Sequence, residues 1–324
     1  MFPKLQCLNL YECPGVTQIP PVATLRTVIV TSCVGLASIQ ALPLLTVLEL
    51  KGCLALARIP ELPQLTHLTI SSCPKFRTLS KRLCQLKVLR MNNCRRIVHI
   101  PSLPRLAELR VTWCDCLAAI PTLPRLRVLQ LFGCRGLTTI DAQPSMRQLQ
   151  FRHCRSLSTI TDATHVTTFL AGSCGNLTAL PDLPAMQGTL EVAGLDALVA
   201  VPKAPLITAL QLKHCVALRE VPRGGFASLH TMFVLCCKRL PSISHLATLT
   251  DLTVQCCAAL THISDMPALA SLEVDQCGAI THIANTPQLT KLKVAFCPGL
   301  HTIPKLKGNA KPDIAVCPKL VPFP

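Results

Sequence analysis

Cysteine is the residue type with the widest chemical repertoire in this sequence, because thiols can act as nucleophiles, bind soft metals or form disulfides. The chain of 324 residues contains 20 cysteines and 10 histidines. Two of its cysteines flank one acid in Cys114-Asp115-Cys116, whereas Cys236 and Cys256 lie 20 residues apart. What these thiols can do depends on the elements that position them, and a regular repeat defines those elements.

The sequence repeats a pattern of about 20 residues over nearly its whole length. The pattern is L-x-x-L-x-L-x-x-C-x-x-L-x-x-I-P-x-L-P-x, and one copy begins at Leu45 and contains Cys53. Its cysteine slot, which we call the ladder position, recurs every 20 residues, except for 21 before Cys94, 21 before Leu195 and 22 before Cys237. The sixteen ladder positions are Cys13, Cys33, Cys53, Cys73, Cys94, Cys114, Cys134, Cys154, Cys174, Leu195, Cys215, Cys237, Cys257, Cys277, Cys297 and Cys317.

This pattern resembles the leucine-rich-repeat family, whose consensus L-x-x-L-x-L-x-x-N/C-x-L it follows across essentially the whole chain. The cysteine-type repeat with an L-x-x-I-P ending resembles those of plant disease-resistance proteins. The I-P-x-L-P segments, such as residues 59–63 and 120–124, resemble bacterial type III effector repeats. Those effectors usually have Asn at the ladder position, where this chain has Cys. The resemblance implies a horseshoe with one parallel β-sheet on its concave face and a receptor-like or effector-like role in binding protein partners.

The residues themselves predict the same architecture. In L-x-x-L-x-L the last two leucines alternate, as on a short strand with its apolar side toward the core. Proline fixes φ and pushes the preceding residue to an extended conformation, so the convex segments are predicted to be extended or polyproline-like. We therefore expect an α/β-class solenoid that is mostly β, with about 16 repeats. It is predicted to form a single domain over residues 1–324, without obvious terminal caps.

The ladder cysteines are interpreted as structural. Each thiol is predicted to be buried in the turn after its strand as a small hydrophobe with a weak S–H donor, because no His or carboxylate completes a metal site. Cys236 and Cys256 precede ladder positions in neighbouring units, which leaves a disulfide or a soft-metal pair open. His262 and His282 also fall in register and are interpreted as solvated surface residues.

Neither an enzyme nor a membrane protein is expected. The sequence has no nucleotide-binding glycine loop, no zinc-protease motif and no zinc-finger spacing, so no catalytic residue, cofactor or metal is predicted. The uncharged residues 27–48 contain Gln40 and Pro43 and fit the repeat, which argues against a transmembrane segment. With no visible signal peptide and reduced cysteines, a cytoplasmic or nuclear location is expected.

Basic residues are concentrated in one part of the chain, where a binding face is predicted. Residues 75–155 contain sixteen Lys and Arg but three Asp and Glu, against 32 and 16 in the whole chain. Strand residues six, four, two and one before each ladder position are expected on the concave face. There this segment carries Arg and the only Trp, which are common at interface hot spots. The predicted partner-binding residues are Arg90, Asn92, Arg110, Trp113, Gln130, Phe132, Gln150 and Arg152.

Two functions fit this face. The favoured one is a protein-interaction scaffold whose partner has an acidic surface. The alternative is a polyanion binder that takes nucleic acid or anionic lipid through residues 75–155. The alternative is less favoured because single-strand binding uses several aromatic platforms, and only Trp113 and Phe132 lie near this charge.

Overall fold

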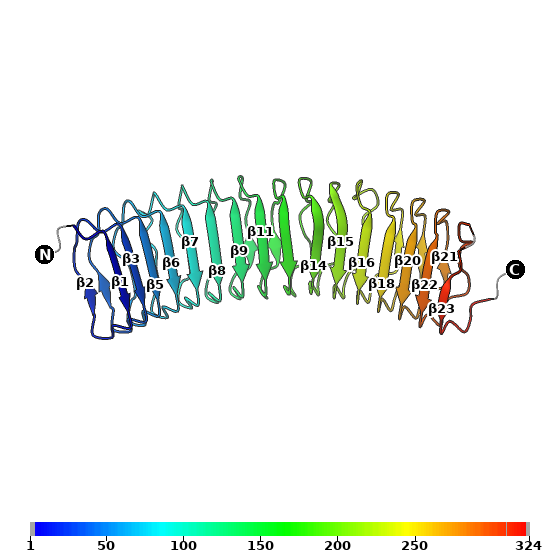
Figure 1. Ribbon diagram of the computed structural model, residues 1–324, viewed down its shortest axis with the longest axis horizontal. Helices are drawn as coiled ribbons and strands as arrows, with labels where there is room; N and C mark the ends of the chain where they lie inside the picture. The colour runs from blue at the N-terminus through cyan, green and yellow to red at the C-terminus, as the bar shows by residue number, and fades with distance from the viewer. Residues whose placement is uncertain (1–3, 309, 322–324) are drawn as a thin grey trace. The chain divides into compact units, whose positions relative to one another are not determined.

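The computed structural model describes residues 4–308 and 310–321. The chain folds into two compact units, Met1–Asp162 (unit 1) and Ala163–Pro324 (unit 2), and each is described by itself. Both are β-solenoids in which each repeat forms one coil, as Figure 1 shows. The described residues include no helix that is long and apolar enough to cross a membrane.

Unit 1 has one strand per coil, and these strands form a parallel sheet in the order of the sequence. Neighbouring strands pair in register, so that Leu48 lies opposite Leu68 and Leu89 opposite Leu109. The strands are β1 (Cys7–Tyr11), β3 (Thr27–Thr31), β5 (Val47–Lys51), β6 (His67–Ser71), β7 (Val88–Asn92), β8 (Glu108–Thr112), β9 (Val128–Phe132) and β11 (Gln148–Arg152).

Unit 2 repeats this arrangement. Its register shifts once, between Gly188 and Thr189, in the repeat that has 21 residues. The strands are β13 (Thr168–Gly172), β14 (Gly188–Ala193), β15 (Ile207–Lys213), β16 (Thr231–Leu235), β18 (Asp251–Gln255), β20 (Ser271–Asp275), β22 (Lys291–Ala295) and β23 (Asp313–Ala315). The predicted strand in every repeat and the parallel pairing are confirmed in both units.

The ladder positions lie inside the coils, as the sequence predicts. Of the ladder cysteines, Cys13 and Cys317 are half-buried and the others are buried. The thiol donates to the carbonyl two residues earlier, as in the 3.3 Å contact from Cys73 Sγ to Ser71 O. Cys134 Sγ also lies 3.6 Å from Val111 O of the preceding coil. A buried thiol therefore helps to satisfy backbone carbonyls at the turn, where a lost hydrogen bond would be costly.

Each coil leaves the sheet through one residue in the left-handed region of backbone space. The residue directly before every ladder position has a φ between 51° and 67°, and we call it the left-handed position. Its N–H still donates to the next coil, as Trp113 N does to Phe132 O at 2.7 Å. The sequence predicts these residues at strand ends, but they lie in the turn, because the strand ends one residue earlier.

The side of the coil opposite the sheet is extended, as predicted, and in places it forms short parallel strands. In unit 1, β2 (Gln18–Ile19) pairs with β4 (Ser38–Ile39), and β10 (Thr139–Ile140) pairs with β12 (Thr159–Ile160). In unit 2, β19 (His262–Ser264) lies between β17 (Ser242–Ser244) and β21 (His282–Ile283). These short strands are not predicted by the repeat pattern.

Proline removes a hydrogen bond that pairs these short strands. The residue after the Ile slot donates its N–H to the preceding coil, as Thr161 N does to Ile140 O and Ala284 N to Ile263 O, both at 3.1 Å. Proline has no N–H to donate. Residues 59–63 and 180–184, which have Pro at this place, accordingly contain no strand.

We therefore expect Thr161→Pro to weaken the pairing of β10 with β12. The substitution removes the N–H that donates to Ile140 O and should lower the free energy of unfolding by about 1 kcal/mol. Thr161→Ala is the matched control, because it keeps the N–H and its exposed side chain makes no core contact. Urea unfolding measures both variants, and an equal loss in the two would contradict the role of this bond.

Burial of the ladder thiols predicts a loss of stability at alkaline pH. Burial raises the pKa of Cys297 from 9.0 to about 12, so the folded state holds this proton more tightly than the unfolded state. Its contribution is complete below pH 9 and is lost as the pH rises toward 12. Urea unfolding at several pH values between these limits should give a steeper decline for wild type than for Cys297→Ala. Cys84→Ala, at an exposed thiol, should retain the wild-type slope.

Candidate functional site

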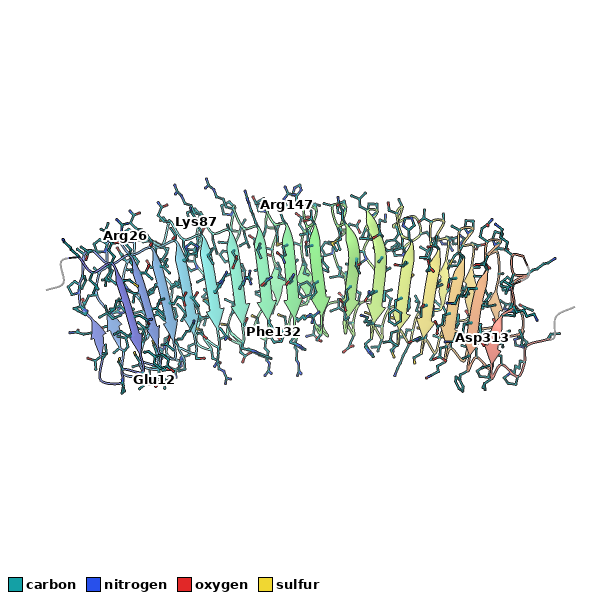
Figure 2. All side chains as sticks on the ribbon, in the orientation of Figure 1. Glu12, Arg26, Lys87, Phe132, Arg147 and Asp313 are labelled. Atoms are coloured by element: carbon teal, nitrogen blue, oxygen red, sulfur yellow. The ribbon has the colours of Figure 1, made fainter. Side chains whose placement is uncertain are left out.

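The eight residues predicted to bind a partner come together in unit 1, on or beside four neighbouring strands, β7, β8, β9 and β11. Arg90 lies opposite Arg110, Arg110 opposite Gln130, and Gln130 opposite Gln150, which forms one column across the exposed face of the sheet. A second column contains Asn92, Thr112, Phe132 and Arg152. Figure 2 labels Phe132 near the carboxyl ends of these strands.

An acidic residue that the sequence prediction does not include organises the basic part of this face. Glu108 Oε1 accepts from Arg90 Nε at 2.9 Å and lies 2.8 Å from Arg110 Nε. One carboxylate thus holds two guanidiniums, and the exposed Arg152 has no ion pair within the described ranges. Glu108 is the first residue of β8, and β8 pairs with β7, which carries Arg90. The register of the repeats therefore indicates that Glu108 and Arg90 lie close together.

Three rings from neighbouring coils form an aromatic row beside these columns. The Trp113 and Phe132 ring centroids are 5.0 Å apart, and those of Phe132 and His153 are 4.9 Å apart. The interplanar angles of 83° and 77° make both contacts edge-to-face, a favourable arrangement of aromatic quadrupoles. His153 is outside the predicted set, although it occupies the same left-handed position in its coil as Trp113 does.

The Trp113 ring lies directly over the backbone of the next coil. Gly133 is at the left-handed position there, with a φ of 66°. A Cβ at Gly133 would collide with Trp113 Cε3 and would lie 2.6 Å from Cζ3. Gly133 therefore serves two purposes, since it adopts positive φ without steric cost and leaves space for the indole. The ring remains 38% exposed.

The other predicted residues add polar groups between the arginines and the rings. Gln130 Nε2 donates to Gln150 Oε1 at 3.1 Å, which orients the two amides along the column. Asn92 is exposed at the carboxyl end of β7. The face thus offers guanidinium, amide and aromatic groups on rigid strands, a set suited to recognition of another surface.

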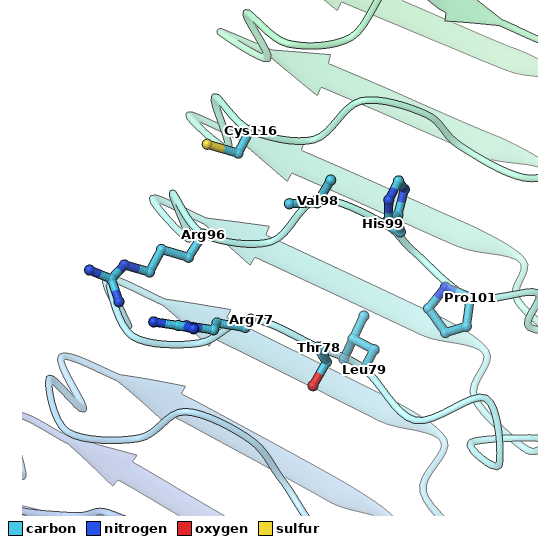
Figure 3. A pocket seen from close by; sticks show the side chains of 8 residues that line it. All are labelled: Arg77, Thr78, Leu79, Arg96, Val98, His99, Pro101 and Cys116. Atoms are coloured by element: carbon cyan, nitrogen blue, oxygen red, sulfur yellow. The ribbon is translucent and has the colours of Figure 1, made fainter.

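A hollow lies on the opposite side of the same coils (Figure 3). Its lining includes Arg77, Arg96, His99 and Cys116, with Leu79, Val98 and Pro101 as apolar surface. Cys114 is fully buried, whereas Cys116 is exposed in this hollow. The Cys114-Asp115-Cys116 cluster is therefore divided between the core and the surface and does not present two thiols at one site.

In unit 2, Cys236 and Cys256 occupy left-handed positions of adjacent coils. Both are half-buried and unpaired, and Cys256 Sγ donates to Gln276 Oε1 at 3.5 Å. Desolvation and the neighbouring Cys236 raise the pKa of Cys256, which disfavours its thiolate. No group of three or more potential metal ligands occurs among the residues with described positions.

The contact between Trp113 and Gly133 predicts the effect of a small substitution. Gly133→Ala should displace the indole from Phe132 and lower the free energy of unfolding by roughly 2 kcal/mol. The cost of displacing the ring adds to the cost of holding an alanine at positive φ. Gly52→Ala is the matched control, with a φ of 67° and nothing nearer to the new Cβ than 3.4 Å. It should cost about half as much.

Fluorescence separates the two effects, because Trp113 is the only Trp in the chain. Gly133→Ala should shift the emission maximum to longer wavelength as the ring becomes more exposed, and Gly52→Ala should leave it unchanged. Identical spectra for both variants would show that Gly133 does not position the indole.

No protein-family model and no curated protein matches the chain. Among solved structures, the crystal structure of a leucine-rich repeat protein from Bacteroides ovatus ATCC 8483 is similar with a TM-score of 0.46 and 12% sequence identity, and the match covers 89% of this chain and 87% of that chain. The fold is defined by this chain's own features and not by that comparison. These features are the 20-residue repeat, the parallel strands paired in register and the buried ladder positions. Together they make each unit a β-solenoid with one sheet strand in every repeat, the architecture that the leucine-rich pattern predicts.

Proposed function

We propose that this chain is a protein-interaction scaffold, and that the sheet face of unit 1 binds a partner with an acidic surface. The observation that carries the proposal is the aromatic row of Trp113, Phe132 and His153, which lies beside exposed arginines on one rigid sheet. Trp and Arg are enriched among the residues that dominate binding energy at protein interfaces. The proposal is for binding rather than for catalysis.

The aromatic row supports this function because its rings are ordered before any partner arrives. Trp113 contacts the backbone of the next coil and the edge of Phe132, so little side-chain entropy remains to be lost on binding. An exposed indole also buries a large apolar area when a partner covers it. The row is therefore suited to be the centre of an interface.

The charges around the row favour an acidic partner. Arg90 and Arg110 share Glu108, which holds both guanidiniums in place and leaves the group of three with a net positive charge. Arg152 adds a further cation next to Phe132. The excess of basic residues over residues 75–155 extends this field, and complementary charge mainly raises the rate and specificity of association.

The domain organisation and location remain part of the proposal. The ladder spacing from Cys154 to Cys174 is the usual 20 residues across the boundary between the units, which supports a single solenoid domain. Cys236 and Cys256 are free thiols although they lie in adjacent coils, which supports a reducing compartment, the cytoplasm or the nucleus.

One observation favours the alternative, a polyanion binder. Arg77 and Arg96 line the hollow on the side opposite the sheet, and neither forms an ion pair within the part of the chain that the structure describes. Arg95 and Arg155 are also exposed in the turns after the ladder positions. A nucleic acid or anionic lipid held by these turns would bind away from the aromatic row.

A pull-down from nuclease-treated lysate tests the site. The site variant combines Trp113→Ala with Arg152→Gln. The matched control combines Phe296→Ala with Arg155→Gln, because Phe296 also occupies a left-handed position, is 54% exposed and lies in unit 2. A protein that binds this face should be retained by wild type and the control and should lose about tenfold or more in affinity for the site variant. Equal capture by all three baits would contradict the assignment.

The salt dependence of the captured complex separates the two functions. Release of counterions makes polyanion binding fall steeply with salt, by about three to five orders of magnitude between 50 and 200 mM for six to ten phosphate contacts. A protein interface centred on Trp113 should lose far less. A steep slope that the control variant reduces and the site variant does not would favour the polyanion alternative.

A further inference from the structure

Two histidines lie next to each other in unit 2, on the side of the coils opposite the sheet. β19 and β21 pair in parallel with His262 opposite His282. Both imidazoles are exposed, whereas the adjacent Ile263 and Ile283 are buried in the core. Because neighbouring strands lie about 4.8 Å apart, the two side chains leave the same surface from backbone positions separated by about that distance.

The hydrogen bonds determine which nitrogen of His262 carries the proton. Thr261 Oγ1 donates to Pro241 O at 3.0 Å and also lies 3.0 Å from His262 Nδ1. A hydroxyl has a single hydrogen, and here the carbonyl, which can only accept, takes it. Thr261 Oγ1 must therefore accept from His262, so Nδ1 carries a proton, and in the neutral imidazole Nε2 has the free lone pair.

The next coil repeats this arrangement. Thr281 Oγ1 donates to Thr261 O at 3.1 Å and lies 2.8 Å from His282 Nδ1. His282 consequently also carries a proton on Nδ1, and its neutral imidazole has an unprotonated Nε2. The structure thus places two imidazoles with the same Nδ1 contact opposite each other on neighbouring strands.

This is the protonation state that a metal ion requires. Histidines that bind metals almost always donate the other ring N–H to an oxygen, which fixes the tautomer and the ring orientation. Metal–nitrogen bonds of about 2.1 Å allow two nitrogens up to about 4 Å apart to share one ion, so small side-chain rotations bring the rings into range. Imidazole is a suitable ligand for Zn, Cu and Ni.

We propose that His262 and His282 form a two-histidine binding site for a divalent transition metal such as Ni²⁺ or Zn²⁺. Water completes the coordination, since the described residues supply no third side-chain ligand at this place. Ser242 and Thr302 flank the pair in the same row and offer hydroxyls to metal-bound water. The site is in unit 2 and does not depend on the proposed partner-binding face.

Unit 1 contains a natural control with one histidine instead of two. Thr66 Oγ1 donates to Thr46 O at 3.0 Å and lies 2.9 Å from His67 Nδ1, which gives His67 the same tautomer. Its in-register neighbours are Val47 and Val88, neither of which can bind a metal. A difference in metal binding between the His262–His282 pair and His67 therefore measures the effect of pairing two imidazoles and not the exposure of one ring.

Equilibrium dialysis against Ni²⁺ tests the proposal, using the full chain after its accessible thiols have been alkylated. Wild type should bind one Ni²⁺ that both His262→Asn and His282→Asn weaken by at least tenfold. His67→Asn should bind like wild type. Equal affinity for wild type and His262→Asn would overturn the proposal, and so would an equal loss for His67→Asn.

A second pair of variants tests the role of the threonine. Thr281→Val keeps both imidazoles but removes the oxygen that orients His282, and it should weaken Ni²⁺ binding several-fold. Thr281→Ser restores that oxygen and should restore binding. Circular dichroism, expected to remain at the wild-type value, and the urea midpoint, expected to fall slightly because the hydrogen bond to Thr261 O is lost, separate loss of the site from loss of the fold. A Thr281→Val variant that is folded and binds like wild type would contradict the positioning role.

Discussion

The structure depends on the turn through which each coil leaves the sheet without interrupting the backbone hydrogen bonds to the next coil. One residue adopts a left-handed conformation, and its N–H continues the parallel hydrogen bonding, as Trp113 N does with Phe132 O. The following ladder residue fills the inside of the turn. A left-handed conformation costs about 1–2 kcal/mol for a residue other than glycine, so the turn persists only because neighbouring coils stack on it. Stability is consequently a property of adjacent coils and not of any one repeat.

This constraint also explains how sites arise in the chain. Because neighbouring strands pair in register over nearly all of each unit, residues about 20 positions apart become neighbours, and every position of the repeat becomes a row across the coils. Glu108 reaches Arg90 of the preceding coil in this way, in addition to Arg110 on its own strand, and His262 comes to lie beside His282. A pair of compatible residues in successive repeats is therefore sufficient to create a site, without any change in the backbone.

Much of the fold can be predicted from the sequence, because apolar spacing determines strands, register and buried ladder positions directly. The left-handed positions cannot be predicted so readily. Only Gly52, Gly133 and Gly194 have the residue type that signals positive φ there, and tertiary stacking imposes it on the others. The eight residues of the candidate site could be placed on one face from their spacing. The contacts of Glu108 with two arginines and the position of the Trp113 indole depend on side-chain orientation. The repeat pattern does not determine that orientation.

The repeat therefore separates the requirements of folding from those of recognition. The turn requires a particular backbone conformation at the left-handed position but not a particular side chain, and residues as different as Glu12, Trp113 and Cys236 satisfy it. The remaining restriction comes from the adjacent coil, because the Trp113 ring, as it lies, leaves no space for a Cβ at Gly133. Substitution of a surface residue can thus require a matching change one repeat away. The surface of such a solenoid therefore depends on pairs of coils, since a single repeat does not contain all the atoms that determine it.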